Sequence, residues 1–264
     1  GGTIAFITGI YQRLIDSLKS FDLNALRLLV AGDFKVFVAK TDLYFLIALF
    51  SGIGISILSL AKLLEYAFVN HEILTLAFFF GLIVASILGV GKQISKFNPA
   101  NVMALIIGVL VAAGIAFLPP AEPNASFIYL SVCGAVAICS MILPGLSGSY
   151  ILLLMGNYVL VMQGISTLNF SILVPIALGC ILGLVLFSRL LSFLFKNYQD
   201  FTVSILTGFV AGSLAIIWPW KDTQYLLLES GKEKAVGYQW YLPEIGSQFW
   251  IALALMLVGF LLVW

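Results

Sequence analysis

Apolar residues gather along this chain in long runs that are separated by short polar segments. Six of these runs approach the roughly 20 residues that a helix needs to span the hydrocarbon core of a bilayer. They predict membrane-spanning helices at about residues 43–64, 73–91, 100–118, 172–195, 201–218 and 247–264.

A seventh run, 126–166, has a different pattern. It is long enough for two crossings, but Pro144-Gly145 stands at its middle. Proline lacks a backbone donor and interrupts a helix, and lipid offers no water to satisfy the groups that are released. We therefore predict a re-entrant hairpin, in which two short helical arms meet at Pro144–Gly148.

The composition is typical of a multi-spanning membrane protein. Of the 264 residues, 62% are apolar and 9% are charged, and the mean hydropathy is +1.12. A soluble domain carries about 25% charged residues. The net charge of +1 gives no basic field for a nucleic acid partner. Nothing in the pattern calls for a metal or an organic cofactor, or specifies an oligomeric state.

The start of the chain repeats a stretch from its middle. Residues 1–11, GGTIAFITGIY, align without a gap on residues 148–158, GSYILLLMGNY. Both copies run from small residues through an apolar stretch to Gly-x-Tyr. We expect residues 1–18 to form the second arm of an equivalent first hairpin, whose Pro-Gly arm would precede Gly1.

The repeat continues beyond this motif. Residues 51–86 align on residues 178–213 at an offset of 127, whereas the motif copies are offset by 147. The difference of 20 residues is about the length of segment 21–40. The spacing of its apolar residues favours an interfacial amphipathic helix interrupted near Gly32. A solvated connector is the alternative interpretation.

Together these patterns predict an all-α polytopic membrane protein with an inverted-topology repeat. The first repeat comprises residues 1–118 and the second residues 126–264, each a re-entrant hairpin followed by three transmembrane helices. Because three crossings are an odd number, the halves are expected to have opposite orientations. Of the 13 lysines and arginines, nine then fall on one side and four on the other. The positive-inside rule makes segment 13–40 cytoplasmic and loop 219–246 external.

The turn at the middle of the second hairpin carries the strongest candidate for a binding site. Its residues are Pro144, Gly145, Ser147, Gly148 and Ser149. The N–H groups that open a helix have no intrahelical partner, and they favour an anion such as a phosphate. The alternative is a Pro-Gly kink whose polar groups are satisfied by neighbouring helices.

Three further groups of residues complete the predicted site. Gly1, Gly2 and Thr3 would contribute in the same way from the first hairpin. Lys62 and Arg189 occupy equivalent positions in the repeat, near segment ends, and could neutralise an anionic head group. Alternatively, both cations extend to the membrane interface and Lys62 pairs with Glu65.

These motifs resemble those of the PopT-type polyprenyl-phosphate transporter family, formerly a domain-of-unknown-function family. The similar segments are GGTIAFITGIY at 1–11, PGLSGSYILLLMGNY at 144–158 and FFFGLIVAS at 78–86. The resemblance extends over essentially the whole chain. It implies transport of undecaprenyl phosphate, a lipid carrier of cell-wall synthesis, in the plasma membrane of a prokaryote. It also implies that the glycine- and serine-rich hairpin positions bind that lipid.

The sequence supports a flippase over two alternatives, a membrane-embedded prenyl pyrophosphate phosphatase and an ion-coupled carrier of small anions. A phosphatase needs a charge clamp and a base or nucleophile near the phosphate. No Asp, Glu or His lies within fifteen residues of the second motif. Moving a negative charge inward against 100 mV costs about 2.3 kcal/mol. We therefore expect coupling to protons or another cation.

Overall fold

The computed structural model of the chain describes residues 5–6, 8–227 and 233–264. The structure is mostly helical, and helices occupy all six predicted spans. They are α5 (Leu43–Asn70), α6 (Glu72–Gly91), α7 (Pro99–Ile115), α11 (Phe170–Asn197), α12 (Gln199–Gly212) with α13 (Leu214–Ile217), and α14 (Ser247–Val263).

Among the described residues, three helical segments are long and apolar enough to cross a membrane, and the number rises to five if each of two bent helix pairs is a single span. Helices α7 and α14 contain 17 residues each, which is the short end of the range for a spanning helix. The predicted polytopic membrane protein is therefore confirmed in its helical body.

The re-entrant segment contains three helices where we predicted two arms. These are α8 (Phe127–Ile142), α9 (Gly148–Leu154) and α10 (Tyr158–Ser166). The break at Pro144–Gly148 is confirmed. A second break follows, where α9 and α10 meet at 112°. Gly156 has a φ of +74° there, which a residue with a side chain adopts at a cost.

Buried Asn157 fixes this second bend. Its side-chain amide donates to the carbonyl oxygen of Asn124 at 2.9 Å, and its side-chain oxygen accepts from the backbone N–H of Asn124, also at 2.9 Å. The start of α10 is thereby tied to the segment that precedes α8.

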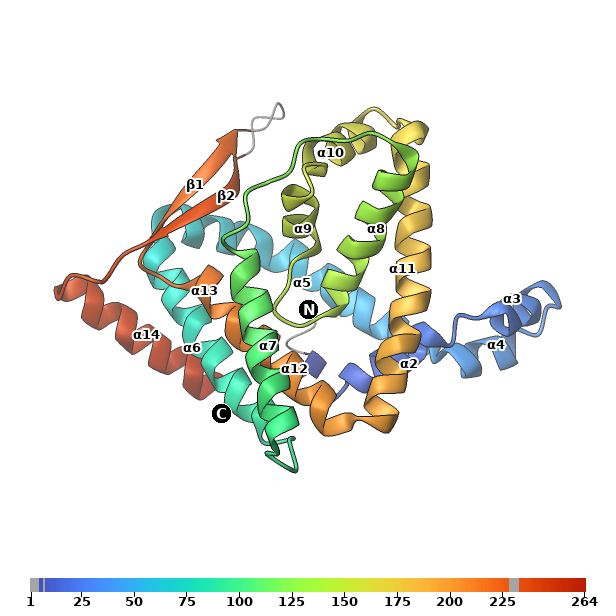
Figure 1. Ribbon diagram of the computed structural model, residues 1–264, viewed down its shortest axis with the longest axis horizontal. Helices are drawn as coiled ribbons and strands as arrows, with labels where there is room; N and C mark the ends of the chain where they lie inside the picture. Colours follow the sequence, from blue (N-terminus) through green and yellow to red (C-terminus); the bar gives the residue numbers. More distant parts are fainter. Residues whose placement is uncertain (1–4, 7, 228–232) are drawn as a thin grey trace.

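The N-terminal part of the chain forms α2 (Tyr11–Lys19), α3 (Leu23–Val30) and α4 (Phe34–Thr41). The predicted interruption near Gly32 is confirmed, since Gly32 separates α3 from α4 with a φ of +78°. The two helices project from one side of the molecule (Figure 1). A bond from the backbone N–H of Ala25 to the side chain of Asp22 caps α3 at 2.8 Å.

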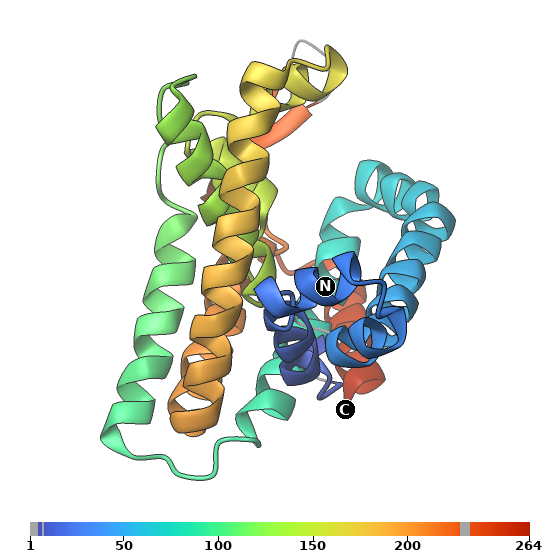
Figure 2. The same ribbon diagram turned by 90° about the vertical axis from the view of Figure 1, so that its right-hand side faces the viewer.

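Three helix pairs form the body: α7 with α12, α14 with α6, and α8 with α11. Figure 2 shows α5 standing apart from α11. Glycines allow the first two pairs to pack backbone to backbone. A Cβ atom on Gly208 would overlap the carbonyl oxygen of Leu105 in α7, and one on Gly81 would overlap that of Met256 in α14. Small residues at such crossings are typical of membrane helices.

The predicted loop 219–246 contains two strands, which form one small hairpin beside the predominantly helical body. β1 (Lys221–Leu227) pairs antiparallel with β2 (Glu233–Trp240). The indole N–H of Trp240 donates to the carbonyl oxygen of Ala215 at 2.7 Å. That bond fixes the base of the hairpin on α13. The hairpin was missed because the prediction rests on apolar runs. Such runs do not show that two nearby polar segments pair by backbone hydrogen bonds.

We predict that Gly208→Ala lowers the free energy of unfolding by about 1–3 kcal/mol, because the added methyl group overpacks the crossing with α7. Thermal unfolding of the purified protein in detergent measures this. Gly89→Ala is the matched control, since a Cβ at Gly89 in α6 would meet nothing within 4 Å. Equal unfolding temperatures for the two variants would contradict the predicted crossing.

Candidate functional site

The turn between α8 and α9 is held against α12. Pro144 is fully buried. Gly145 has a φ of +86°, and a Cβ atom there would lie 2.7 Å from the carbonyl oxygen of Phe209. A Cβ on Gly148 would lie 2.6 Å from the carbonyl oxygen of Ala137 in α8. Both glycines are therefore required by close backbone packing, and they fix the path of the turn.

Two hydroxyl groups stand at this turn. The Oγ atoms of Ser147 and Ser149 are 3.1 Å apart, and Ser147 is exposed while Ser149 is half-buried. Ser147 occupies the N-cap position of α9, but its side chain makes no capping hydrogen bond. Helix α9 has only seven residues and therefore a small dipole. In the candidate site, hydroxyls and local N–H groups would bind the anion.

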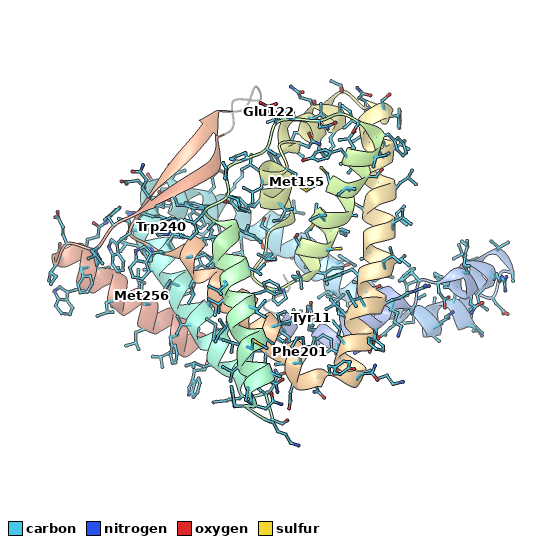
Figure 3. The ribbon with its side chains drawn as sticks, viewed as in Figure 1. Tyr11, Glu122, Met155, Phe201, Trp240 and Met256 are labelled. Carbon is cyan, nitrogen blue, oxygen red and sulfur yellow. The ribbon has the colours of Figure 1, made fainter. Side chains whose placement is uncertain are left out.

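The described part of the first motif lies next to this turn. Tyr11 is labelled in Figure 3. Its hydroxyl donates to the carbonyl oxygen of Ile142, the last residue of α8, at 3.0 Å. Ala5, Phe6 and Ile142 belong to the same buried cluster as Tyr11. The structure thus brings the described part of the first motif against the end of α8, directly before the turn that leads into the second motif. Gly1, Gly2 and Thr3 lie outside the described residues.

The two predicted cations are both exposed. Lys62 lies on α5 and Arg189 on α11. Phe187 and Leu191 contribute to the buried cluster, so Arg189 occupies the opposite face of α11. Among the described residues neither cation forms an ion pair, and the alternative Lys62–Glu65 pair is not formed. Their contribution to binding stays a prediction.

Sequence reasoning missed a charged cluster where α2 meets α11. Ser192 of α11 donates to Asp16 at 2.8 Å and accepts from the Lys19 ammonium at 3.0 Å. Asp16 and Lys19 are three residues apart and so share one face of α2. This spacing could have suggested a charged face on α2. It could not identify Ser192 as the partner, because Ser192 is 176 residues away from Asp16.

A charged pocket of about 450 Å³ adjoins this cluster. Arg13 and Asp42 line it and form an ion pair at 2.6 Å, and Lys40, also in the lining, pairs with Asp22 at 2.6 Å. The hydrogen bond from Lys40 holds the pKa of Asp22 below its usual value. These pairs connect α2 and α3 to the end of α4.

Comparison with known proteins identifies the relatives of this chain. A family model described as undecaprenyl phosphate translocase-like matches residues 1–235. The chain belongs to this family. A "Polyprenyl-phosphate transporter" of Vibrio cholerae serotype O1 (strain ATCC 39315 / El Tor Inaba N16961) is 40% identical over 271 residues, which cover 100% of this chain and 88% of that protein.

A second relative is more distant. A "Polyprenyl-phosphate transporter" of Staphylococcus aureus (strain NCTC 8325 / PS 47) is 28% identical over 201 residues, which cover 69% of this chain and 71% of that protein. No solved structure matches the chain. The family resemblance carried by residues 1–11, 78–86 and 144–158 is confirmed.

We predict that Tyr11→Phe lowers the free energy of unfolding by about 1–3 kcal/mol, because the carbonyl of Ile142 loses its donor. Denaturant or thermal unfolding in detergent measures this. Tyr66→Phe is the control, since Tyr66 is 61% exposed on α5. An effect as large at Tyr66 as at Tyr11 would show that the bond to Ile142 is not the cause.

Proposed function

We propose that this protein carries a polyprenyl phosphate, such as undecaprenyl phosphate, between the leaflets of a prokaryotic plasma membrane without cleaving the phosphate ester. The full-length identity of 40% to a polyprenyl-phosphate transporter is the observation that carries this proposal. The structure supports it with a polar turn, held by closely packed glycines, inside an apolar helical body.

The phosphate head group is the part of the lipid that resists transfer, because the hydrocarbon core offers it no hydrogen bonds. In our proposal Pro144, Gly145, Ser147, Gly148 and Ser149 receive the head group, together with Gly1, Gly2 and Thr3 of the first motif. Lys62 and Arg189 would neutralise its charge on entry or release. The prenyl chain stays in lipid.

We also propose that the chain is an inverted repeat comprising residues 1–118 and 126–264. Paired elements have equal lengths: α2 and α10 contain nine residues each, and α5 and α11 contain 28 each. Figure 1 supports opposite orientations, because α6 descends where its counterpart α12 ascends. Inverted repeats of this kind support alternating exposure of a site at their interface.

The glycine crossings support the same proposal. Gly81 and Gly208 are offset by 127 residues, which is the offset of the second aligned block. Gly81 of α6 packs against α14, and Gly208 of α12 packs against α7. The second helix of each half therefore pairs with the third helix of the other half.

Reconstitution into liposomes with a labelled undecaprenyl phosphate tests the transport proposal. We predict protein-dependent redistribution of the lipid between leaflets without release of phosphate. Ser147→Ala should slow it by about tenfold, as the loss of a hydrogen bond to a charged group costs about 1.5–3 kcal/mol. Ser59→Ala is the control, because the Ser59 hydroxyl bonds only within its own helix, to Ile55 and Ser56.

Each alternative has its own result in this experiment. Phosphate release would favour a phosphatase, and competition by inorganic anions would favour a carrier of small anions. We propose coupling to protons or another cation. A redistribution rate that does not change when both the pH gradient and the membrane potential are dissipated would contradict that coupling.

We predict that segment 13–40 is cytoplasmic and that loop 219–246 is external. In a variant with Cys133, Cys139 and Cys180 replaced by alanine, Lys35→Cys should react with an impermeant thiol reagent only after the cells are opened. Glu244→Cys should react in intact cells. Both side chains are exposed, so burial does not explain a failure to react. The reverse pattern would invert the proposed orientation.

A further inference from the structure

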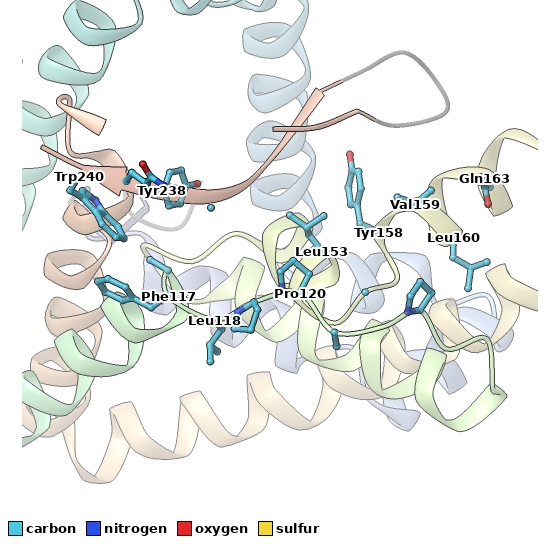
Figure 4. A pocket seen from close by; sticks show the side chains of 17 residues that line it. Phe117, Leu118, Pro120, Leu153, Tyr158, Val159, Leu160, Gln163, Tyr238 and Trp240 are labelled. Atoms are coloured by element: carbon cyan, nitrogen blue, oxygen red, sulfur yellow. The ribbon is translucent and has the colours of Figure 1, made fainter. Parts of the chain in front are cut away.

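A second, larger pocket lies at the far end of α9 from the Ser147 turn. Its volume is about 870 Å³, within the range of roughly 300–1,000 Å³ typical of small-molecule sites. Figure 4 shows its walls: the connector around Phe117 and Pro120, the α9–α10 bend at Leu153 and Tyr158, and β2 at Tyr238 and Trp240. It therefore adjoins the last residues of the second motif.

The pocket lining is amphipathic. Leu118, Leu153, Val159 and Leu160 provide apolar walls, while Gln163 adds a polar group. No charged side chain lines the pocket within the described residues. A ligand that fills it must therefore present mostly apolar surface, and any charge of that ligand must be recognised from behind the lining.

A buried cation lies directly behind that lining. Lys221 is only 9% exposed. In the β hairpin Lys221 faces Trp240, and Tyr238 lies two residues from Trp240 on β2, so all three side chains share one face. The Lys221 ammonium lies 4.3 Å from the centroid of the Tyr238 ring and donates to the carbonyl of Ile216. Its charge is thus directed toward the wall that Tyr238 and Trp240 form.

No carboxylate forms an ion pair with Lys221 in the part of the chain that the structure describes. Burial lowers its pKa to about 8, and the charge of Glu72 at the start of α6 acts in the opposite direction. The side chain is therefore mostly protonated at pH 7. Burial of a cation that has no ion-pair partner costs free energy, and a bound anion would offset part of that cost.

Tyr238 also packs against a cluster on α9 that contains a buried hydroxyl. Tyr150, in the second motif, is 8% exposed, and its hydroxyl has no hydrogen-bond partner among the described residues. It belongs to a buried cluster on α9 against which Tyr158 and Tyr238 pack. Tyr238 thus packs against the cluster that holds this donor and lies under the Lys221 ammonium. A hydroxyl donor and a cation near one pocket wall suit an anion that carries several acceptor oxygens.

We propose that this pocket is a second binding station for a prenyl phosphate, in which Lys221 and Tyr150 attract the phosphate and the apolar walls receive the first isoprene units. This inference rests on the proposed transport function and extends its site toward the β hairpin. The rest of the long prenyl chain exceeds the pocket and lies in lipid. In this proposal Lys221 does not line the pocket, and its positive charge attracts the head group across the wall that Tyr238 and Trp240 form.

Photolabelling of the full chain in lipid nanodiscs tests this proposal. The probe is a ten-carbon prenyl phosphate with a photoreactive group in its chain, and labelled peptides are identified by mass spectrometry. We expect labelling of residues 116–123 and 153–163 in the wild type. Lys221→Met should reduce it about tenfold or more, because a buried charge partner is lost. Lys221→Arg keeps the charge and should retain labelling.

The controls separate a binding role from a structural one. Lys96→Met removes an exposed cation on a connector and should leave labelling unchanged. Lys221→Met should also unfold at a higher temperature than the wild type, since it removes an uncompensated buried charge. If Lys221→Met is more stable than the wild type and is labelled less by the probe, misfolding does not explain the loss of labelling. Tyr150→Phe should weaken labelling several-fold.

Competition identifies the source of the ligand. Unlabelled geranyl phosphate should displace the probe, whereas geraniol and inorganic phosphate at the same concentration should not. Equal displacement by geraniol would show that the pocket does not recognise charge, and equal displacement by inorganic phosphate would indicate a free-anion site. Either result, or full labelling of Lys221→Met, would overturn the proposal.

The transport function is tested separately. If the wild type translocates undecaprenyl phosphate and Lys221→Met is labelled normally, only the second station fails. If labelling depends on Lys221 but the wild-type protein does not translocate undecaprenyl phosphate, the proposed transport is wrong and the proposed binding site is supported.

Discussion

The structure depends on one constraint: a helix can break inside lipid only where other parts of the protein satisfy and cover the exposed backbone. The break after α8 meets this constraint through long-range contacts. Tyr11 donates to the carbonyl of Ile142, Pro144 is buried, and Gly145 packs against the backbone of Phe209. The polar turn is therefore stabilised by α2 on one side and by α12 on the other.

Helix α12 links this turn to the rest of the helical body. Gly208 allows α12 to pack against α7, and the next residue, Phe209, contacts Gly145 of the turn. The buried cluster that surrounds Tyr11 and Ile142 also includes Val203 and Leu206 of the same helix. Because packed helices tolerate little overlap, a shift of α12 against α7 must also move the floor of the turn. The position of the candidate site and the pairing of the helices are thus coupled mechanically.

The sequence predicted those features that depend on local pattern. Apolar runs located all the long helices, Gly32 marked the interruption between α3 and α4, and Pro144 marked the first break. The bend at Gly156 was missed because it depends on Asn157 bonding to Asn124, 33 residues earlier. The β hairpin and the burial of Lys221 were missed for a similar reason. Both require the segment after α13 to fold back onto the helical body.

The positions of the predicted site residues show the same division between local pattern and long-range contact. The serines of the turn follow from the Pro-Gly break, and the structure places them together. The side on which Arg189 lies could not be predicted, since it depends on how α11 rotates to bury Phe187 and Leu191. The bond from Tyr11 to Ile142 joins residues 131 positions apart. No local pattern identifies such a partner.

The two polar places along the second motif share one energetic property. Ser147 makes no capping hydrogen bond at the start of α9, the Tyr150 hydroxyl has no hydrogen-bond partner among the described residues, and Lys221 behind the pocket wall forms no ion pair among them. Simpler side chains would make the fold more stable at each position. Helix α9 places the pocket residue Leu153 about 9 Å from the Ser147 turn. A phosphate bound at either place would relieve part of this cost, so the polar groups that weaken the empty protein are the ones that favour its anionic ligand.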